Sequence, residues 1–174
     1  MSSRRGFLGT MIGGAAGAAM AGAATTATAA SRGRVRGAND RVRFGLIGGG
    51  SRGKEILKAA IGCPNVEPAA VADIYTRRLD EAKAIAPGAS THRDYRALLD
   101  DKSIDAVLIA TPQHLHALHF VAAVQAGKDV YQEKTMAFNA NHARRMKNAL
   151  AGTDRVVQVG MQMNSGDGVR KVRD

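Results

Sequence analysis

The chain has 174 residues, 45% of them hydrophobic, which is enough for one domain with its own core. Its net charge of +10 is concentrated in residues 1–43, which carry seven Arg and one Asp, whereas the rest carries 18 Lys and Arg against 14 Asp and Glu. Because only 4% of the residues are aromatic and the charge lies mostly in a leader, the composition argues against a nucleic-acid partner, and the single Cys63 excludes an internal disulfide.

Residues 1–30 are predicted to be a leader and not part of the fold. They begin S-S-R-R-G-F-L-G-T and continue as a Gly-, Ala- and Thr-rich run with few Leu, Ile or Val, which argues against a membrane span. Arg4 and Arg5, followed by Phe7 and Leu8, resemble a twin-arginine export signal, although Gly9 stands where that signal usually has lysine. We therefore expect export to the periplasm by the twin-arginine machinery; the alternative is a disordered tail with a chance arginine pair.

Residues 31–41, S-R-G-R-V-R-G-A-N-D-R, are predicted to be a basic linker. A solvated linker is the default expectation for such a charged stretch. The alternative is an arm that packs on a partner subunit of a homo-oligomer.

From residue 42 onward, apolar strand patterns alternate with helical ones. The segment 104–110 is apolar at nearly every position, as expected for a strand covered on both faces. This alternation predicts an α/β fold with a doubly wound parallel sheet. Strands are expected up to residue 47 and at 66–73, 104–110, 129–132 and 155–159, and helices at 52–61, 76–86, 94–99, 114–126 and 139–150.

The first strand leads into F-G-L-I-G-G-G-S-R-G, where Gly48, Gly50 and Gly53 have the G-x-G-x-x-G spacing. In a dinucleotide-binding turn the first glycine allows the sharp bend, the second lets the backbone approach a pyrophosphate, and the third lets the helix pack closely. Asp73 lies 20 residues after Gly53, where a carboxylate can accept hydrogen bonds from a ribose. These features predict a Rossmann domain at residues 42–174; the alternative is a purely structural glycine turn.

Further polar residues follow the other predicted strands. They are Thr111 and Pro112, then Glu133, Lys134 and Thr135, and finally Gln162. Ligands of open parallel sheets bind beyond the carboxyl ends of the strands, so we expect these residues to share one edge with the glycine turn.

Three blocks resemble the Gfo/Idh/MocA oxidoreductases, the glucose–fructose oxidoreductase and inositol dehydrogenase family: I-A-T-P-Q-H-L-H-A, A-G-K-D-V-Y-Q-E-K and V-G-M-Q-M-N-S. The resemblance implies an N-terminal Rossmann domain that binds NAD(P), followed by an α/β domain that holds a sugar or polyol. Since the chain ends G-V-R-K-V-R-D without a helix stop signal, we expect it to be the cofactor half, truncated before the substrate domain.

The resemblance also implies roles for individual residues. The phosphate loop would consist of Gly48, Gly50, Ser51, Arg52 and Gly53, Asp73 would hold the adenosine ribose, and the cofactor trough would be lined by Thr111, Pro112 and His116. Glu133 and Lys134 match the family's E-K-P motif, with the lysine near the nicotinamide and the substrate oxygen, and Gln162 would lie near the nicotinamide.

Lys134 is the expected catalytic residue, which would stabilise or protonate the developing alkoxide. The family's next residue is a proline that fixes the backbone, and here it is Thr135, so the resemblance does not define the orientation of Lys134. The alternative is a surface lysine at a strand end.

Two other clusters are interpreted conservatively. His114, His116 and His119 have offsets that do not place all three on one helix face, so no metal site is expected. Arg77 and Arg78 could meet the 2′-phosphate of NADP, but Asp73 would repel it, so we expect NAD, with NADP as the alternative.

The leading hypothesis is an NAD(P)-dependent oxidoreductase that moves hydride between a sugar-like or polyol substrate and the nicotinamide. A second is an exported NAD-dependent glycosidase of the same fold, although such relatives carry another residue in place of the E-K-P lysine. A third is a truncated nucleotide-binding module without activity.

Overall fold

The computed structural model describes residues 41–161; the predicted leader, most of the linker and Gln162 lie outside the described residues. None of the helices within residues 41–161 is long and apolar enough to cross a membrane. The elements in chain order are β1 Val42–Ile47, α3 Ser51–Ile61, β2 Val66–Ala72, α4 Thr76–Ile85, β3 Ser90–His92, α5 Tyr95–Asp100, β4 Ala106–Ile109, α6 Gln113–Gln125, β5 Asp129–Glu133, α7 Ala140–Leu150 and β6 Val157–Gly160.

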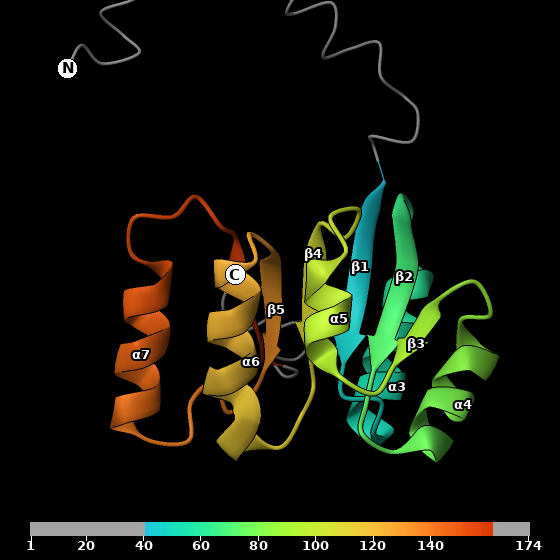
Figure 1. Ribbon diagram of the computed structural model, residues 1–174, viewed down its shortest axis with the longest axis horizontal. Helices are drawn as coiled ribbons and strands as arrows, with labels where there is room; N and C mark the ends of the chain where they lie inside the picture. Colours follow the sequence, from blue (N-terminus) through green and yellow to red (C-terminus); the bar gives the residue numbers. More distant parts are fainter. Residues whose placement is uncertain (1–40, 162–174) are drawn as a thin grey trace, which may run out of the picture. The chain divides into compact units, whose positions relative to one another are not determined.

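The strands form one six-stranded sheet in the order β3-β2-β1-β4-β5-β6 (Figure 1). Every pairing is parallel. The chain winds outward from β1 to β3, then returns to the other side of β1 and winds outward again to β6. This confirms the doubly wound parallel sheet, and it places the topological switch point between β1 and β4.

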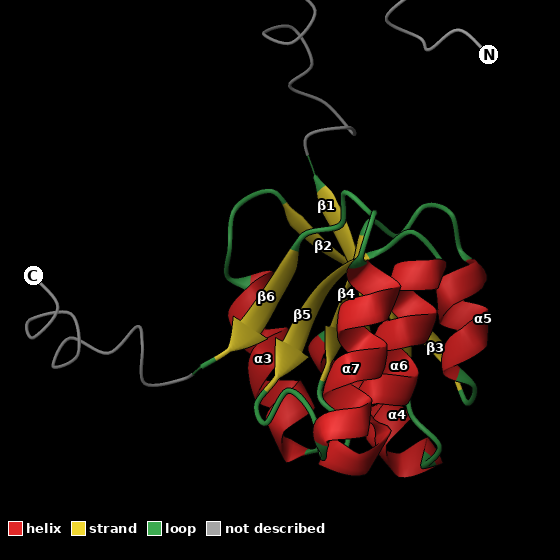
Figure 2. Ribbon diagram, turned by 90° about the vertical axis from the view of Figure 1, so that its left-hand side faces the viewer, coloured by secondary structure: helices red, strands yellow, loops and turns green. Residues whose placement is uncertain are grey.

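Helices cover both faces of the sheet. Side chains point alternately to the two faces along each strand, and apolar side chains on both faces are buried against these helices. Figure 2 shows α5, α6 and α7 together on one side of the strands and α3 on the other. Phe44 and Leu46 of β1 pack with residues of α3 and α4 in one apolar cluster, whereas Ile47 belongs to a second cluster with residues of α5, α6 and α7. The nearly continuous apolar strands predicted from the sequence are thus buried from both sides.

The expected elements are all present, with most boundaries shifted by one or two residues, and the structure adds one strand, β3. β3 was not predicted, because it is a three-residue edge strand of Ser, Thr and His that has no apolar pattern. The 94–99 helix begins one residue later, because Asp94 is its N-cap and accepts a hydrogen bond from the Arg96 amide at 2.9 Å.

Candidate functional site

A cavity of about 560 Å³ opens at the carboxyl ends of the strands, at the switch point between β1 and β4. Its walls come from the ends of β1, β2 and β4, the first turns of α3 and α6, and the segment around α5. Of the residues predicted from the sequence, seven line it: Gly48, Gly50, Ser51, Arg52, Asp73, Thr111 and Pro112. Gly53, His116, Glu133 and Lys134 lie outside its lining.

The glycine turn, residues 48–53 and called the phosphate loop below, has backbone geometry that requires glycine at two positions. Gly48 has a φ of +101°, and a Cβ on Gly53 would lie 1.9 Å from the Gly48 carbonyl oxygen. Beside Gly50 the nearest atom to such a Cβ would be Cζ of Arg78 at 3.9 Å, so this part of the loop is open. The first amides of α3, which begins at Ser51, have no intrahelical acceptor and point to where an anion can bind.

Asp73 is buried directly behind the phosphate loop. Its Oδ2 accepts a hydrogen bond from the Gly49 amide at 2.8 Å, and its Oδ1 accepts one from the Tyr75 amide at 2.9 Å. Arg78 lies 3.6 Å from Oδ2. The carboxylate therefore holds the phosphate loop in place while it faces the cavity, where its remaining lone pairs can accept from a ribose hydroxyl.

Several cavity residues were not singled out from the sequence. Ile74 and Tyr75 follow β2 and are 66% and 58% exposed, which offers an apolar surface for a flat ring, and the Arg78 guanidinium lies 4.8 Å from the centre of the Tyr75 ring. Arg93 and Tyr95 reach the cavity from the segment after β3. Of this group, only Arg78 was considered as a cofactor contact from the sequence, as part of the pair Arg77 and Arg78. Arg93 and Tyr95 reach the cavity because they follow β3, which the sequence pattern did not predict.

His119 supports the cavity from α6. Its Nδ1 lies 3.0 Å from the Thr111 hydroxyl, and its ring meets Tyr95 edge to face, with 4.5 Å between ring centres. Burial, helped by the positive charges of His116 and Arg96, lowers the pKa of His119 to about 4. The ring is therefore neutral near pH 7, and it can orient the Thr111 hydroxyl without adding charge.

His116 was expected to line the trough, but its side chain is buried beneath the cavity. Its Nδ1 lies 2.7 Å from the carbonyl oxygen of Thr135, and its Nε2 lies 2.8 Å from that of Thr111. Carbonyl oxygens only accept, so a ring nitrogen of His116 that carries a proton donates to the carbonyl oxygen beside it. His116 thus ties the end of β4 to the end of β5.

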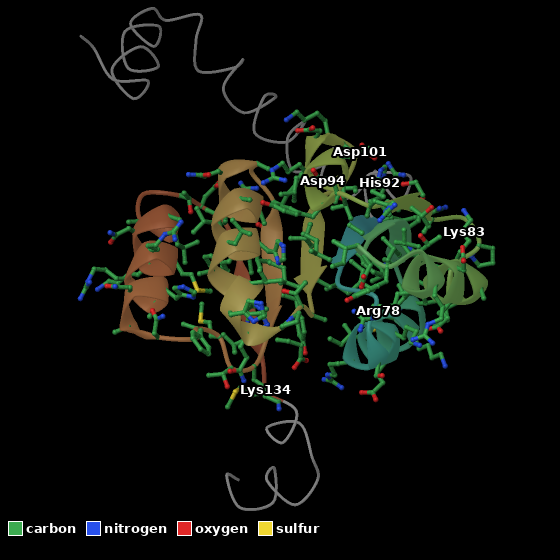
Figure 3. All side chains as sticks on the ribbon, turned by 60° about the horizontal axis from the view of Figure 1, so that its bottom comes forward. Arg78, Lys83, His92, Asp94, Asp101 and Lys134 are labelled. Atoms are coloured by element: carbon green, nitrogen blue, oxygen red, sulfur yellow. The ribbon has the colours of Figure 1, made fainter. Side chains whose placement is uncertain are left out.

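Residues 133–135, called the lysine loop below, follow β5 at the same edge. Figure 3, in which this edge comes forward, labels Lys134 at the end of β5 and Arg78 beside α3. Lys134 is exposed, and the peptide bond that joins it to Thr135 is cis. Glu133 is buried and accepts two hydrogen bonds at Oε1 from Arg52, at 3.0 and 2.8 Å. The lysine loop therefore contacts the phosphate loop directly.

Residues 41–161 contain no group of three His, Cys, Asp or Glu side chains placed to hold a metal ion. Of the three histidines considered for metal binding, His116 and His119 are instead occupied with Thr111 and Thr135. The chemistry of the cavity is that of an anion-binding loop, a carboxylate and a flat apolar wall, which fits a dinucleotide.

Comparisons with known proteins agree with this geometry. Residues 42–161 match the model of the oxidoreductase family with an NAD-binding Rossmann fold, GFO/IDH/MocA. Inositol 2-dehydrogenase 2 of Saccharopolyspora erythraea is 34% identical over 121 residues, which cover 68% of this chain and 36% of that protein. A glycosyl hydrolase family 109 protein of Stenotrophomonas maltophilia is 40% identical over 98 residues, which cover 50% of this chain and 22% of that protein.

Among solved structures, myo-inositol dehydrogenase from Lactobacillus casei in complex with NAD(H) and myo-inositol superposes with a TM-score of 0.71. It is 26% identical, and the match covers 76% of this chain and 40% of that one. The chain thus spans well under half the length of these relatives, and the part that it spans is their cofactor-binding domain. The prediction of an NAD-binding Rossmann domain is confirmed.

Proposed function

Since the chain belongs to the GFO/IDH/MocA family of oxidoreductases, we propose that it is the cofactor-binding part of a dehydrogenase for a sugar or polyol. The observation that carries this proposal is the position of Lys134, which follows β5 at the same sheet edge as the phosphate loop and Asp73. The two relatives that are inositol dehydrogenases support a polyhydroxylated substrate.

In this proposal NAD supplies the hydride acceptor when bound, and the chain's own residues bind it. The amides of the phosphate loop and the N-terminus of α3 bind the pyrophosphate, and Asp73 accepts from the adenosine ribose. The flat wall of Ile74 and Tyr75 packs against the adenine. Lys134 is left exposed. As the substrate hydroxyl releases its proton to solvent and its carbon gives hydride to NAD, the Lys134 ammonium group would donate a hydrogen bond to that oxygen.

The test compares the wild type with Lys134→Ala and Lys134→Arg in the protein as its gene encodes it. NAD affinity is measured by calorimetry, and turnover is followed by NADH absorbance with a panel of inositols and sugars. We expect Lys134→Ala to lower kcat by about 100-fold or more while the Kd for NAD stays within about twofold. Lys134→Arg retains the positive charge and is the control for the loss of charge in Lys134→Ala. A wild type that binds no NAD, or an alanine variant with unchanged kcat, contradicts the proposal.

We further propose that NAD is preferred over NADP. Asp73 faces the position of the ribose and repels a 2′-phosphate, although Arg78 lies only 3.6 Å from that carboxylate. Calorimetric titration of the chain with each cofactor should give about tenfold tighter binding of NAD, and Asp73→Ser should narrow the difference. Equal affinities in the wild type would show that Arg78 and Arg93 outweigh the carboxylate.

A second candidate function is an NAD-dependent glycosidase. It is favoured by the 40% identity with the family 109 glycosyl hydrolase, and Lys134 argues against it. Incubation with aryl glycosides separates the two activities. A dehydrogenase accumulates NADH, whereas release of the aryl alcohol without net NADH supports the glycosidase.

We also propose that the protein is exported through the twin-arginine pathway, supported by Arg4 and Arg5 ahead of Phe7 and Leu8. Replacement of both arginines by lysine should retain the protein in the cytoplasm of a bacterial host, and cell fractionation would show it. Periplasmic localisation of the double variant would contradict the proposal. The basic linker, residues 31–41, is proposed to be solvated. Light scattering with and without these residues tests the alternative, an arm that packs on a partner subunit.

A further inference from the structure

Arg52 is the residue that connects the phosphate loop to the lysine loop. It lies in the first turn of α3 and lines the cavity. Its Nε and Nη2 donate to Oε1 of Glu133 at 3.0 and 2.8 Å, and its Nη1 donates to Glu55 at 2.9 Å. A guanidinium has five N–H groups, so this ion pair leaves donors that can face an anion in the cavity.

Glu133 is a buried carboxylate that depends on this arginine. Its side chain is 5% exposed, and within residues 41–161 Arg52 is the cation that lies within 4.0 Å of it. The Tyr131 hydroxyl lies 3.4 Å from Oε1, and Oε2 accepts a hydrogen bond from the Lys134 amide at 3.2 Å. Glu133 therefore transmits the position of Arg52 to the backbone of Lys134.

The neighbouring strand leaves room for this arrangement. A Cβ on Gly160 of β6 would lie 2.8 Å from Oε1 of Glu133 and 2.5 Å from the Tyr131 hydroxyl. Burial raises the pKa of Tyr131, and the charge of Glu133 raises it further, so the phenol stays neutral. Hydrogen bonds to Glu133 and Glu55 raise the pKa of Arg52, so its charge is permanent.

The electrostatics of the site require the pair to act together. A carboxylate buried without a counter-charge is unfavourable, and one beside an anion-binding loop also repels a pyrophosphate. Two N–H donors of Arg52 converge on Oε1 of Glu133 and neutralise the carboxylate, while Oε2 accepts from the Lys134 amide. Phosphate binding and the backbone position of Lys134 thus depend on the same guanidinium.

We propose that Arg52 is a positioning residue for Lys134: through Glu133 it holds the lysine loop, and by neutralising Glu133 it permits a pyrophosphate to bind at the phosphate loop. The proposal rests on the function proposed above, because it assigns to the same site a residue, Arg52, that acts on Lys134 through Glu133. It differs from a simple phosphate contact, since it predicts that removal of Glu133 repairs part of the damage caused by removal of Arg52.

The first experiment titrates the full 174-residue chain with NAD by calorimetry. Arg52→Met leaves Glu133 unpaired and should weaken binding about tenfold or more, and the double variant Arg52→Met/Glu133→Gln should recover about threefold or more of that loss. Arg52→Lys retains the charge and should lose less affinity than Arg52→Met. Arg41→Met removes an exposed arginine that pairs with Glu67 on the surface, and this control should change the Kd by less than about twofold. The proposal is overturned if the double variant binds NAD no more tightly than Arg52→Met, or if Arg52→Lys binds NAD as weakly as Arg52→Met.

The second experiment measures hydrogen exchange of the Lys134 amide by NMR in the same chains without NAD. Arg52→Met should accelerate this exchange about tenfold, whereas Arg41→Met should leave it unchanged. Unchanged exchange in Arg52→Met overturns the proposed link while the function stands. If the wild type binds no NAD, the proposed function fails, and the exchange rates still decide whether Arg52 holds the lysine loop.

Discussion

The phosphate loop and the lysine loop lie at the same edge of the sheet but are held in different ways. The phosphate loop is held mainly by its own backbone, through a positive φ at Gly48 and the missing side chain at Gly53, and one distant side chain, that of Asp73, accepts a hydrogen bond from its Gly49 amide. The lysine loop is fixed by side chains from distant segments, since Arg52 bonds to Glu133 and His116 bonds to Thr135. The phosphate loop is therefore held chiefly by backbone conformation and close packing, whereas the lysine loop is held chiefly by side chains.

The difference indicates how each loop tolerates change. A backbone-held loop fails when a single atom is added, because the backbone has no other conformation to adopt. A loop held by side chains loses its support in parts, since each contact contributes separately. The loss of stability should therefore differ between a change within the phosphate loop and the removal of one side-chain support of the lysine loop. Three substitutions with their controls measure these losses.

The largest effect is expected for Gly53→Ala. The added Cβ would lie 1.9 Å from the Gly48 carbonyl oxygen, so α3 or the loop must move, and the free energy of unfolding should fall by about 3 kcal/mol. NAD binding should be lost with it. Urea unfolding and calorimetry measure the two effects.

The matched control is Gly88→Ala, since a Cβ there has no described atom within 4 Å and the backbone is not left-handed. It should change stability by about 1 kcal/mol or less. If Gly53→Ala is as stable as this control, the phosphate loop is not held by close packing, and the comparison fails.

A smaller loss of stability is expected for His116→Leu, which removes a side chain that supports the lysine loop. The substitution removes the contacts of Nδ1 and Nε2 with the carbonyl oxygens of Thr135 and Thr111, and it should cost about 2 kcal/mol of stability. Gln113→Ala is the control: it removes only a 3.3 Å contact with the Thr135 hydroxyl, at an exposed position, and should cost about 0.5 kcal/mol or less. Equal losses in the two variants would mean that His116 is not the main support of the loop.

An effect of similar size to that of His116→Leu is expected as a pH dependence from His119, which contacts the Thr111 hydroxyl. Its pKa is lowered to about 4 in the folded state from the usual 6.5, chiefly by burial. Because the unfolded state then binds the proton more readily, this contribution to stability is present above about pH 6.5 and decreases as the pH falls toward 4. Between about pH 7.5 and about pH 5 the expected loss is about 2 kcal/mol.

The measurement is urea unfolding of the wild type and of His119→Gln at both pH values. The variant should be less stable at neutral pH but lose less on acidification, since glutamine does not titrate. Parallel losses in the two proteins would assign the acid sensitivity to other groups.

Much of the fold can be predicted from local sequence patterns, namely apolar runs and the spacing of glycines. The apolar runs at β1, β2 and β4 predict buried parallel strands, and the glycine spacing predicts the turn, because Gly48 needs a positive φ and Gly53 has no room for a Cβ. Asp73 is marked by its distance from that turn. By contrast, β3 was missed, because an edge strand of three polar residues needs no apolar pattern.

The sequence alone determined the doubly wound sheet, the phosphate loop and the sheet edge at which Lys134 lies, because backbone constraints and strand periodicity act over short distances along the chain. Only the tertiary structure decided that Arg52 meets Glu133, 81 residues away, and that His116 lies beneath the cavity and not in its wall. Arg52 lies in α3 and Glu133 at the end of β5, while His116 of α6 contacts residues after β4 and β5, so these contacts form only when the sheet order brings distant elements to one edge. The spacing of residues along the chain does not specify which of these side chains will meet.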